Sequence, residues 1–219
     1  MASVTVIAVD GPGGVGKSTV SKTLAARLGF AYINTGAMYR ALALAAVQSG
    51  VDIRDKEALE EFCKGAAVVY DASVNSVSVN KDDYTAEVGG LKAGESASII
   101  STNALVRSVL VAYQRSLGLT ASCVMEGRDI GTVVFPDATI KFFLDAPPDV
   151  RAKRRGAEFS MTSDASIDHA LRQRDKRDAE RIVSPLRCAP DAVHVDTGNL
   201  DLNGVVEKML AILEDRGIR

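Results

Sequence analysis

Short apolar runs alternate with amphipathic stretches along most of the chain. Residues 4–9 form an apolar run rich in β-branched side chains that ends at a glycine cluster, which predicts a strand buried on both faces. Residues 17–28 repeat their apolar positions with helical spacing and stop at Gly29, which predicts a helix. By the same criteria, further strands are predicted at 30–33, 122–125, 139–144 and 192–195, and further helices at 37–48, 55–63, 94–101, 103–117 and 201–214. This alternation predicts a doubly wound α/β core with right-handed crossovers.

Two of these helices carry more specific signals. Asn103 stands at the start of one of them and is a predicted N-cap, because its side chain can accept a hydrogen bond from the first turn. In the last helix, the apolar residues are predicted to share one face that packs on the core. These residues are Leu202, Val205, Val206, Met209, Leu210 and Leu213.

The pattern changes between residues 66 and 90, where apolar and small polar residues alternate. The alternating apolar positions are Val68, Tyr70, Val74, Val77 and Val79. Turn-forming residues stand at 71–73 and 80–83. An alternation of period two between turns indicates antiparallel hairpins rather than a strand–helix–strand crossover. A small β element is therefore predicted to be inserted into the α/β core.

Composition and charge exclude several classes of protein. The 219 residues are 47% apolar and 25% charged, so a packed core is expected and disorder is not. With 26 basic and 28 acidic residues the formal charge is −2, which excludes a polyelectrolyte that coats a nucleic-acid polymer or a membrane. The apolar runs are far shorter than the roughly 20 residues of a membrane helix. The chain also begins without the charged and apolar regions of a signal peptide.

The cysteines and histidines narrow the chemistry further. Cys63, Cys123 and Cys188 are widely spaced and odd in number, so neither a disulfide framework nor a zinc knuckle is indicated. Reduced thiols in a cytoplasmic protein are expected. His169 and His194 are the two histidines of the sequence, which excludes a histidine-rich metal site.

The strongest chemical signal follows the first predicted strand and opens the next helix. The segment fits G-x-x-x-x-G-K-[ST], the pattern of a phosphate-binding loop. Its glycines allow successive backbone N–H groups to face one anion, and the helix N-terminus adds its dipole. Lys17 would reach the outer phosphates of ATP, and the Ser18 hydroxyl would ligate Mg²⁺. The predicted ATP-binding residues are Gly11, Pro12, Gly13, Gly14, Val15, Gly16, Lys17, Ser18 and Thr19.

A second match is interpreted as accidental. Residues 80–83, Asn-Lys-Asp-Asp, fit the N-K-x-D motif with which GTPases read guanine. A GTPase also needs a D-x-x-G switch between the two motifs, and residues 18–80 contain none. Because Asn and Asp are ordinary turn residues, the segment is predicted to be a hairpin turn.

A phosphotransferase needs a second anion site opposite ATP, and isolated arginines stand where it would form. Arg40 lies one helical turn after the hydroxyl of Thr35, and Arg128 with Asp129 follows a predicted strand, at the sheet edge where α/β proteins bind ligands. Residues 151–181 are helical in pattern and carry nine Lys/Arg against six Asp/Glu. Such a segment is either a solvated face or a lid that brings arginines to a transferring phosphoryl group.

Several motifs together resemble the bacterial cytidylate kinases, in register from about residue 4 to 215. The resemblance is carried by D-G-P-G-G-V-G-K-S-T at 10–19, T-G-A-M-Y-R at 35–40, G-R-D-I-G-T-V-V-F-P-D at 127–137, and Arg174, Asp175, Asp178, Arg181 and 184–186. It implies a three-layer P-loop core with a mostly five-stranded parallel sheet, an inserted acceptor lobe with the β element, and a helical lid. The implied boundaries are 1–36, 119–150 and 182–219 for the core, 37–118 for the acceptor lobe and 151–181 for the lid.

The resemblance also implies an activity and the residues that carry it. The implied reaction is the transfer of the γ-phosphoryl group of ATP, with Mg²⁺, to CMP or dCMP. The implied catalytic residues are Lys17, Arg128 and Arg181. The implied acceptor-binding residues are Thr35, Arg40, Ser98, Arg107, Arg128, Asp129, Asp178 and Arg181. A monomer that acts on small-molecule nucleotides is expected.

Two alternatives remain open from the sequence. The first is another small-molecule kinase on the same core, with a different monophosphate or a hydroxyl acceptor. The second is a nucleotide-binding regulator, which the missing switch motifs disfavour.

Overall fold

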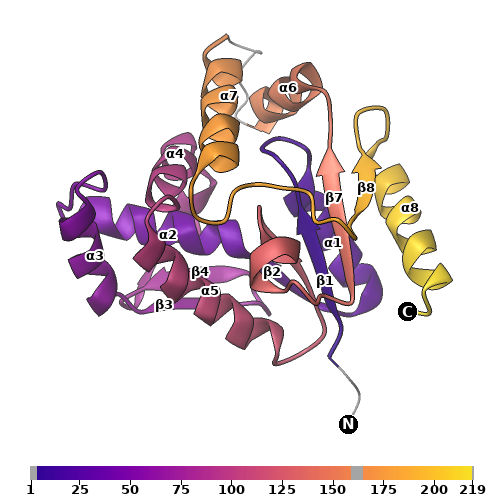
Figure 1. Ribbon diagram of the computed structural model, residues 1–219, viewed down its shortest axis with the longest axis horizontal. Helices are drawn as coiled ribbons and strands as arrows, with labels where there is room; N and C mark the ends of the chain where they lie inside the picture. The colour runs from indigo at the N-terminus through magenta and orange to yellow at the C-terminus, as the bar shows by residue number, and fades with distance from the viewer. Residues whose placement is uncertain (1–3, 159–164, 219) are drawn as a thin grey trace.

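A five-stranded parallel sheet forms the centre of the computed structural model, which describes residues 4–158 and 165–218 (Figure 1). The strand order is β2-β6-β1-β7-β8, and every neighbouring pair is parallel. The strands are β1 (Val6–Asp10), β2 (Ala31–Asn34), β6 (Cys123–Glu126), β7 (Ile140–Asp145) and β8 (Val193–Asp196). The predicted fold class is therefore confirmed.

Helices cover both faces of this sheet, so that the core has three layers and two apolar interfaces. On one face, α1 (Lys17–Leu28) and α8 (Leu202–Asp215) pack over Ile7, Val9 and Phe142. On the other face, α2 (Thr35–Gln48) and α5 (Ala104–Gly118) cover Val6, Ala8 and the rest of the second apolar cluster. The strands read as continuous apolar runs because their side chains are buried in both directions.

The segment after α2 is the predicted insertion with a β element. It contains α3 (Lys56–Gly65), the antiparallel strands β3 (Val68–Asp71), β4 (Ser76–Val79) and β5 (Asp82–Asp83), and then α4 (Leu91–Ile100) and α5. Asn80 and Lys81 join β4 to β5 with φ values of 53° and 76°, the left-handed values that a tight hairpin turn requires. The N-K-x-D match is thus a hairpin turn, as predicted.

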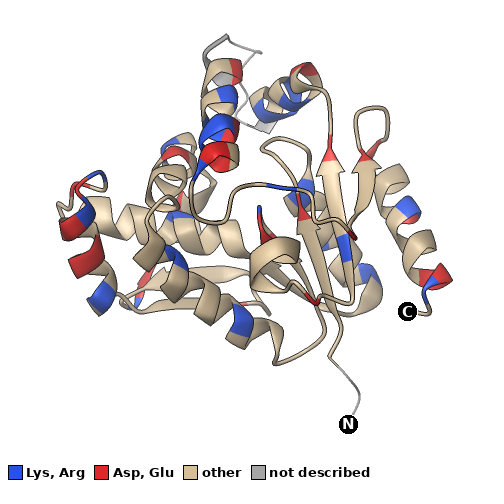
Figure 2. Ribbon diagram, in the orientation of Figure 1, with Lys and Arg blue, Asp and Glu red and all other residues tan. Residues whose placement is uncertain are grey.

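Two charged helices stand at the carboxyl ends of the strands. They are α6 (Pro148–Glu158) and α7 (Ala165–Glu180), and the arrowheads of β7 and β8 point toward them in Figure 1. Figure 2 shows basic and acidic residues interspersed along both helices. Residues 159–164, which connect the two helices and belong to the predicted lid, lie outside the described residues.

Local chemistry explains where the predicted elements begin and end. Gly29 ends α1 in the left-handed conformation, and Asn103 caps α5 by accepting from the amides of Leu105 and Val106, at 2.9 and 3.2 Å. Two smaller predictions are wrong. Val74 lies in the turn between β3 and β4 and is 69% exposed, and Leu202 at the first turn of α8 is 38% exposed rather than part of its buried face.

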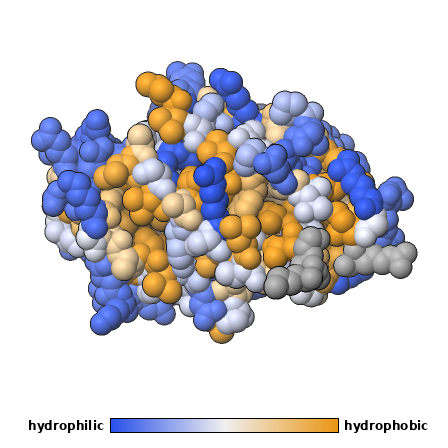
Figure 3. Space-filling view, turned by 60° about the horizontal axis from the view of Figure 1, so that its bottom comes forward, coloured by the Kyte–Doolittle hydropathy of each residue, from blue (hydrophilic) through white to orange (hydrophobic). Residues whose placement is uncertain are grey.

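Some large apolar side chains are exposed on the surface, apart from those buried in the core. Figure 3 shows one face on which hydrophobic patches are broken up by hydrophilic side chains. Within the described part of the chain, no helix combines the length and the apolar character that crossing a membrane requires.

The cap of α5 has a measurable consequence because this helix carries Arg107 into the cavity described below. Replacing Asn103 with Ala removes the acceptor for two amides, and we expect the free energy of unfolding to fall by about 1 kcal/mol in urea denaturation. Asn103→Ser keeps a capping oxygen without adding a charge beside Glu60 and should stay within a few tenths of a kcal/mol of the original chain. Equal losses in both variants would show that the amide group acts through its contact with Glu60 instead.

Candidate active site

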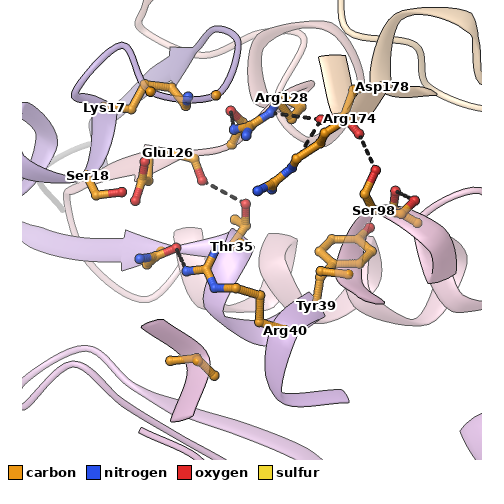
Figure 4. Close-up of a pocket in the computed structure, with 18 of the residues that line it drawn as sticks. Lys17, Ser18, Thr35, Tyr39, Arg40, Ser98, Glu126, Arg128, Arg174 and Asp178 are labelled. Atoms are coloured by element: carbon orange, nitrogen blue, oxygen red, sulfur yellow. Dashed lines mark hydrogen bonds and ion pairs between the residues drawn. The ribbon is translucent and has the colours of Figure 1, made fainter. Parts of the chain in front are cut away.

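A cavity of about 440 Å³ lies at the carboxyl edge of the sheet, between the glycine-rich loop and the inserted segment (Figure 4). It is bounded by the loop at 13–19, the start of α2, the end of β6, the helices α4 and α5, and α7. Among the described residues that line it, seven are Lys or Arg and three are Asp or Glu. The cavity is therefore suited to anions.

The glycine-rich loop follows β1 and wraps the N-terminus of α1. Gly11, Gly14 and Gly16 have φ values of 148°, 76° and 88°, which side chains rarely adopt. A Cβ at Gly11 would also meet the carbonyl oxygen of Leu144 at 2.1 Å, so the loop needs glycine there for close packing as well. Of the predicted ATP-binding residues, Gly13, Gly14, Gly16, Lys17, Ser18 and Thr19 line the cavity.

The other three residues of the motif shape the loop instead of lining the cavity. Val15 is buried in the apolar core, and its carbonyl oxygen accepts from the Thr197 hydroxyl at 3.2 Å. The carbonyl oxygen of Pro12 accepts from Lys17 Nζ at 2.6 Å. Burial, with Arg128 as the next cause, holds the pKa of Lys17 well below its usual range. A phosphate group arriving at this lysine would reverse that effect.

Three arginines face the loop from the opposite wall and form what we call the arginine wall: Arg40, Arg128 and Arg174. In Figure 4 the guanidinium of Arg174 extends into the cavity between Arg128 and Thr35. Within residues 4–158 and 165–218, the buried Nε atoms of Arg40 and Arg174 have no hydrogen-bond partner. Burial lowers the pKa of Arg40, and burial together with nearby Arg128 lowers that of Arg174 to about 9. The side chains of both arginines line the cavity, where an anion can pair with their charge.

Asp178 fixes one side of the arginine wall. Its carboxylate accepts from Arg128 Nε at 3.1 Å and lies 3.8 Å from Arg174 Nε. The Ser98 hydroxyl donates to the same carboxylate at 3.2 Å. Burial alone would raise the pKa of Asp178, but the neighbouring arginines outweigh burial and hold it below its usual value.

A second carboxylate, Asp129, lies at the far end of the cavity between two more arginines. It is paired with Arg107, from α5, and accepts from Arg181 Nη2 at 3.3 Å. Arg107 also lies over the ring of Tyr39, with its Cζ atom 5.6 Å from the ring centroid. Asp129 and Arg107 both line the cavity and are about 95% or more buried, so this pair is shielded from bulk water.

The end of β6 places a third carboxylate close to the glycine-rich loop. Glu126 is buried, and its Oε1 atom accepts from the Tyr32 hydroxyl at 2.6 Å. Its backbone carbonyl oxygen accepts from the hydroxyl of Thr35 at 2.7 Å. Glu126 and Ser18 both line the cavity, and Figure 4 shows them near one another.

The arginines of α6 do not all reach into the cavity as the lid hypothesis expects. Arg151 donates to the carbonyl oxygen of Gly13 at 3.1 Å and pairs with Asp175, which in turn accepts from the Gly13 amide at 3.1 Å. Arg154 donates to Thr197 through its hydroxyl and carbonyl oxygens, at 2.9 and 2.6 Å. Both side chains therefore anchor α6 to the loops around it, whereas Arg155 and Arg174 line the cavity.

The structure brings together all eight residues predicted for the acceptor, although they come from five separate segments. Thr35, Arg40, Ser98, Arg107, Arg128, Asp129, Asp178 and Arg181 all line the cavity. Arg181 lies at the Asp129 end, where its guanidinium also donates to Ser101 and Ser184. The sequence analysis assigned no individual role to Arg174 and none to Glu126, because their neighbours are distant along the chain.

Asp10, the last residue of β1 and the first of the motif at 10–19, is a further buried carboxylate, to which the sequence assigned no role. Its Oδ1 atom accepts from the Ile130 amide and its Oδ2 atom from the Gly131 amide, both at 2.8 Å. Burial raises the pKa of Asp10 to about 6, even though the two amides act in the opposite direction.

A glycine-rich loop that faces an arginine wall across one cavity, on this sheet topology, defines a P-loop kinase. A solved gluconokinase from Sinorhizobium meliloti shares this fold, with a TM-score of 0.54, 15% identity and coverage of 99% of this chain and 95% of that one. The family model "Cytidylate kinase" matches residues 7–215.

Curated relatives agree with the family model over nearly the full length. A cytidylate kinase of Solibacter usitatus is 44% identical over 217 residues, which is 96% of this chain and 93% of the relative. A cytidylate kinase of Geobacillus kaustophilus is 43% identical over 216 residues, 96% of each chain. The chain belongs to the cytidylate kinase family.

The raised pKa of Asp10 predicts a pH dependence of stability with a definite sign. Because the folded chain binds this proton more tightly than the unfolded chain, stability falls as pH rises from the unfolded to the folded pKa. Between about pH 4 and pH 6, we expect the original chain to lose roughly 3 kcal/mol more unfolding free energy than Asp10→Asn, which lacks the proton. Urea denaturation of both chains across this window measures the difference. Parallel pH curves for the two chains would contradict the raised pKa.

Proposed function

We propose that this chain transfers the γ-phosphoryl group of ATP to CMP or dCMP, which gives ADP and CDP or dCDP. The observation that carries the proposal is the single cavity with the glycine-rich loop at one end, the arginine wall in the middle and the Arg107–Asp129–Arg181 cluster at the other. The names of the relatives agree with it.

The proposal divides the chain into three functional parts. Residues 1–36, 119–150 and 182–219 form the core that binds ATP, and residues 37–118 form the lobe that binds the acceptor. Residues 151–181 form the lid. We further propose that the protein works as a monomer in the cytoplasm on free nucleotides.

The acceptor's phosphate is assigned to the arginine wall and to Thr35. The side chains of Arg40, Arg128 and Arg174 all line the cavity. A phosphate would bring the negative charge and the acceptors that suit these guanidinium groups, in a setting shielded from water where charge-assisted hydrogen bonds are strong. The buried carboxylate of Asp178 is assigned to the hydroxyl groups of the sugar.

The cytosine is assigned to Asp129, Arg107 and Ser98. Cytosine has an exocyclic amino donor beside two acceptors, N3 and O2. The carboxylate of Asp129 accepts from the amino group, while Arg107 and Ser98 donate to the two acceptors. Arg181 lies against Asp129 and supports its charged form, so we assign Arg181 to the base end rather than to the transferring phosphoryl group.

Catalysis then consists of positioning and charge neutralisation. Lys17 from the loop and Arg128 and Arg174 from the wall face the space between the two nucleotides and offset charge on the transferring phosphoryl group. Closing α6 and α7 over the cavity excludes water, which would otherwise accept the phosphoryl group. The acceptor oxygen belongs to a phosphate that is already anionic, so no general base is required.

Ser18 and Glu126 are a donor set suited to Mg²⁺, which prefers a hydroxyl or carboxylate together with phosphate oxygens. Both line the cavity at the glycine-rich loop. When bound, Mg²⁺ neutralises part of the charge of the ATP phosphates. The hydrogen bond from Tyr32 to Glu126 holds this carboxylate in place.

The assignment of the base predicts the order of acceptors. Against uracil, the Asp129 carboxylate faces a carbonyl oxygen and Arg107 faces an N–H group, so both contacts become unfavourable. In a coupled assay of ADP release, kcat/KM should be highest for CMP and dCMP, lower for UMP by up to about 10⁴-fold, and lowest for AMP, whose purine overfills the pocket. Asp129→Ala should lose most activity on CMP and narrow the CMP/UMP ratio. Equal use of UMP or AMP by the original chain would remove the cytidylate assignment and leave another kinase on this core.

Lys17 is expected to act on the transition state more than on ATP binding, because the loop amides also hold the nucleotide. Replacing Lys17 with Ala should lower kcat by about a hundredfold or more, the loss of one preorganised charge. Nucleotide affinity, measured by titration calorimetry, should change much less. Turnover close to that of the original chain would exclude the loop lysine from the chemistry.

The lid assignment predicts a ligand-dependent change in backbone protection. Amides of residues 151–158 and 165–181 should exchange more slowly with deuterium when ATP and CMP analogues bind together than when the chain is free. The buried strand β1 serves as the internal reference. If the protection of the two helices is the same with and without ligands, they are a fixed part of the fold.

A further inference from the structure

Asp10 connects the donor loop to the base-reading end of the cavity through two hydrogen bonds. It is the last residue of β1 and immediately precedes Gly11, the first residue of the glycine-rich loop. Its two carboxylate oxygens each accept one backbone N–H, from Ile130 and Gly131, which lie 120 and 121 residues further along the chain. These amides immediately follow Asp129.

The two amides control the direction of the Asp129 side chain. The Ile130 N–H belongs to the peptide plane that turns with the ψ angle of Asp129, so the bond to Asp10 sets that angle. Asp129 has φ −150° and ψ 26°, outside the usual helical and strand regions, and residues 130–134 form a single π-helical turn. Asp10 restrains the backbone next to Asp129, while Arg107 and Arg181 hold its carboxylate.

Packing leaves little room for the turn to relax in another way. The Gly131 backbone lies against Lys141 on β7, where an added Cβ would approach the lysine Cδ at 3.0 Å. Lys141 is itself held by Asp191 at 2.7 Å. The turn after Asp129 is thus confined between β1 and β7, and Asp10 supplies the acceptors for its first two amides.

We propose that Asp10 is a positioning residue for base selection, which holds Asp129 in the orientation that reads cytosine and links that orientation to the strand that carries the ATP loop. This inference rests on the proposed function, because it requires Asp129 to contact the base. Asp10 itself contacts neither nucleotide, since it does not line the cavity.

The charged carboxylate of Asp10 is suited to positioning Asp129, whereas burying this charge does not stabilise the fold. Burial disfavours the charged carboxylate, and Asp129 adds repulsion, while Lys17 and the two amides act in the opposite direction. Cys188 and Lys141 also lie near it, and the pKa of Cys188 is raised by burial and by Asp10. A neutral amide at this position would avoid the burial of a charge, but it would turn an N–H₂ group toward one of the two backbone amides. Only the carboxylate satisfies both amides.

The experiment compares Asp10→Asn with the original chain in steady-state kinetics with CMP, UMP and ATP. We expect the KM for CMP to rise by about ten- to a hundredfold, the effect of misplacing a binding group, and the CMP/UMP ratio of kcat/KM to fall by a similar factor. The KM for ATP should change less than threefold. A variant that merely folds less completely would lower kcat and leave both KM values and the CMP/UMP ratio unchanged.

Asp55→Asn is the matched control. Asp55 also accepts two consecutive backbone amides, of Glu57 and Ala58, but it lies at the start of α3 and away from the cavity. Both amides donate to the same oxygen, Oδ1, which Asn retains, so this variant should alter neither base preference nor, by more than a few tenths of a kcal/mol, stability. In the double variant Asp10→Asn with Asp129→Ala, the two losses in CMP/UMP ratio should not add, because Asp10 acts through Asp129.

The outcomes separate this inference from the proposed function. If the original chain prefers CMP and Asp10→Asn keeps both the CMP/UMP ratio and the KM for CMP, Asp10 does not position Asp129. If the losses add fully in the double variant, Asp10 acts by another route and the inference is also overturned. If the original chain shows no preference for CMP, the proposed function itself fails.

Discussion

Uncompensated positive charge inside the cavity is the constraint on which the rest of the structure depends. Arg40, Arg128 and Arg174 converge opposite Lys17, and burial together with neighbouring arginines lowers the pKa of Lys17 and Arg174. Desolvated cations that face one another are unfavourable until an anion arrives. The free protein is therefore predisposed to bind phosphate groups. Two bound nucleotides would supply the negative charge that the described residues of the cavity do not.

Carboxylates divide this positive charge into two functional ends. Asp178 fixes Arg128 and Arg174 from behind and leaves their remaining donors directed into the cavity. Asp129 holds Arg107 and Arg181 at the other end, where a ligand meets polar groups that are already paired with one another. The same residue types thus produce an attractive site for a phosphate and a selective site for a base. Because both are built on the carboxyl edge of one sheet, Asp10 can tie them together through the backbone.

Local sequence signals predicted the elements and the members of the site better than they predicted individual contacts. The glycine at 29 and the cap at Asn103 act within one helical turn, so their effects were visible in the sequence. The exposure of Val74 and Leu202 was not visible, because alternation and helical spacing do not show where a strand stops or how a first turn is oriented. The residues that the resemblance in motifs implied for the acceptor lie together in one cavity.

Contacts between distant segments account for what the sequence could not show. Arg151 and Arg154 are basic residues in a predicted lid, yet backbone carbonyl groups of the glycine-rich loop and of Thr197 hold them. Arg174, one of several basic residues on its helix, is distinguished only by its buried position facing Arg128. Pairings of this kind depend on tertiary structure alone. A charge run in a sequence gives the number of cations but not the direction in which each one points.

Substituting Arg174 with Met tests most directly whether the positive charge of the cavity destabilises the free protein and favours the binding of phosphate. Methionine keeps a long apolar stem and removes the charge, and Asp178 retains its bond to Arg128. The account predicts that Arg174→Met unfolds at a higher urea concentration than the original chain when no ligand is present, and that CMP stabilises it much less. A variant that is less stable without ligand, and that CMP stabilises as strongly as the original chain, would contradict the account.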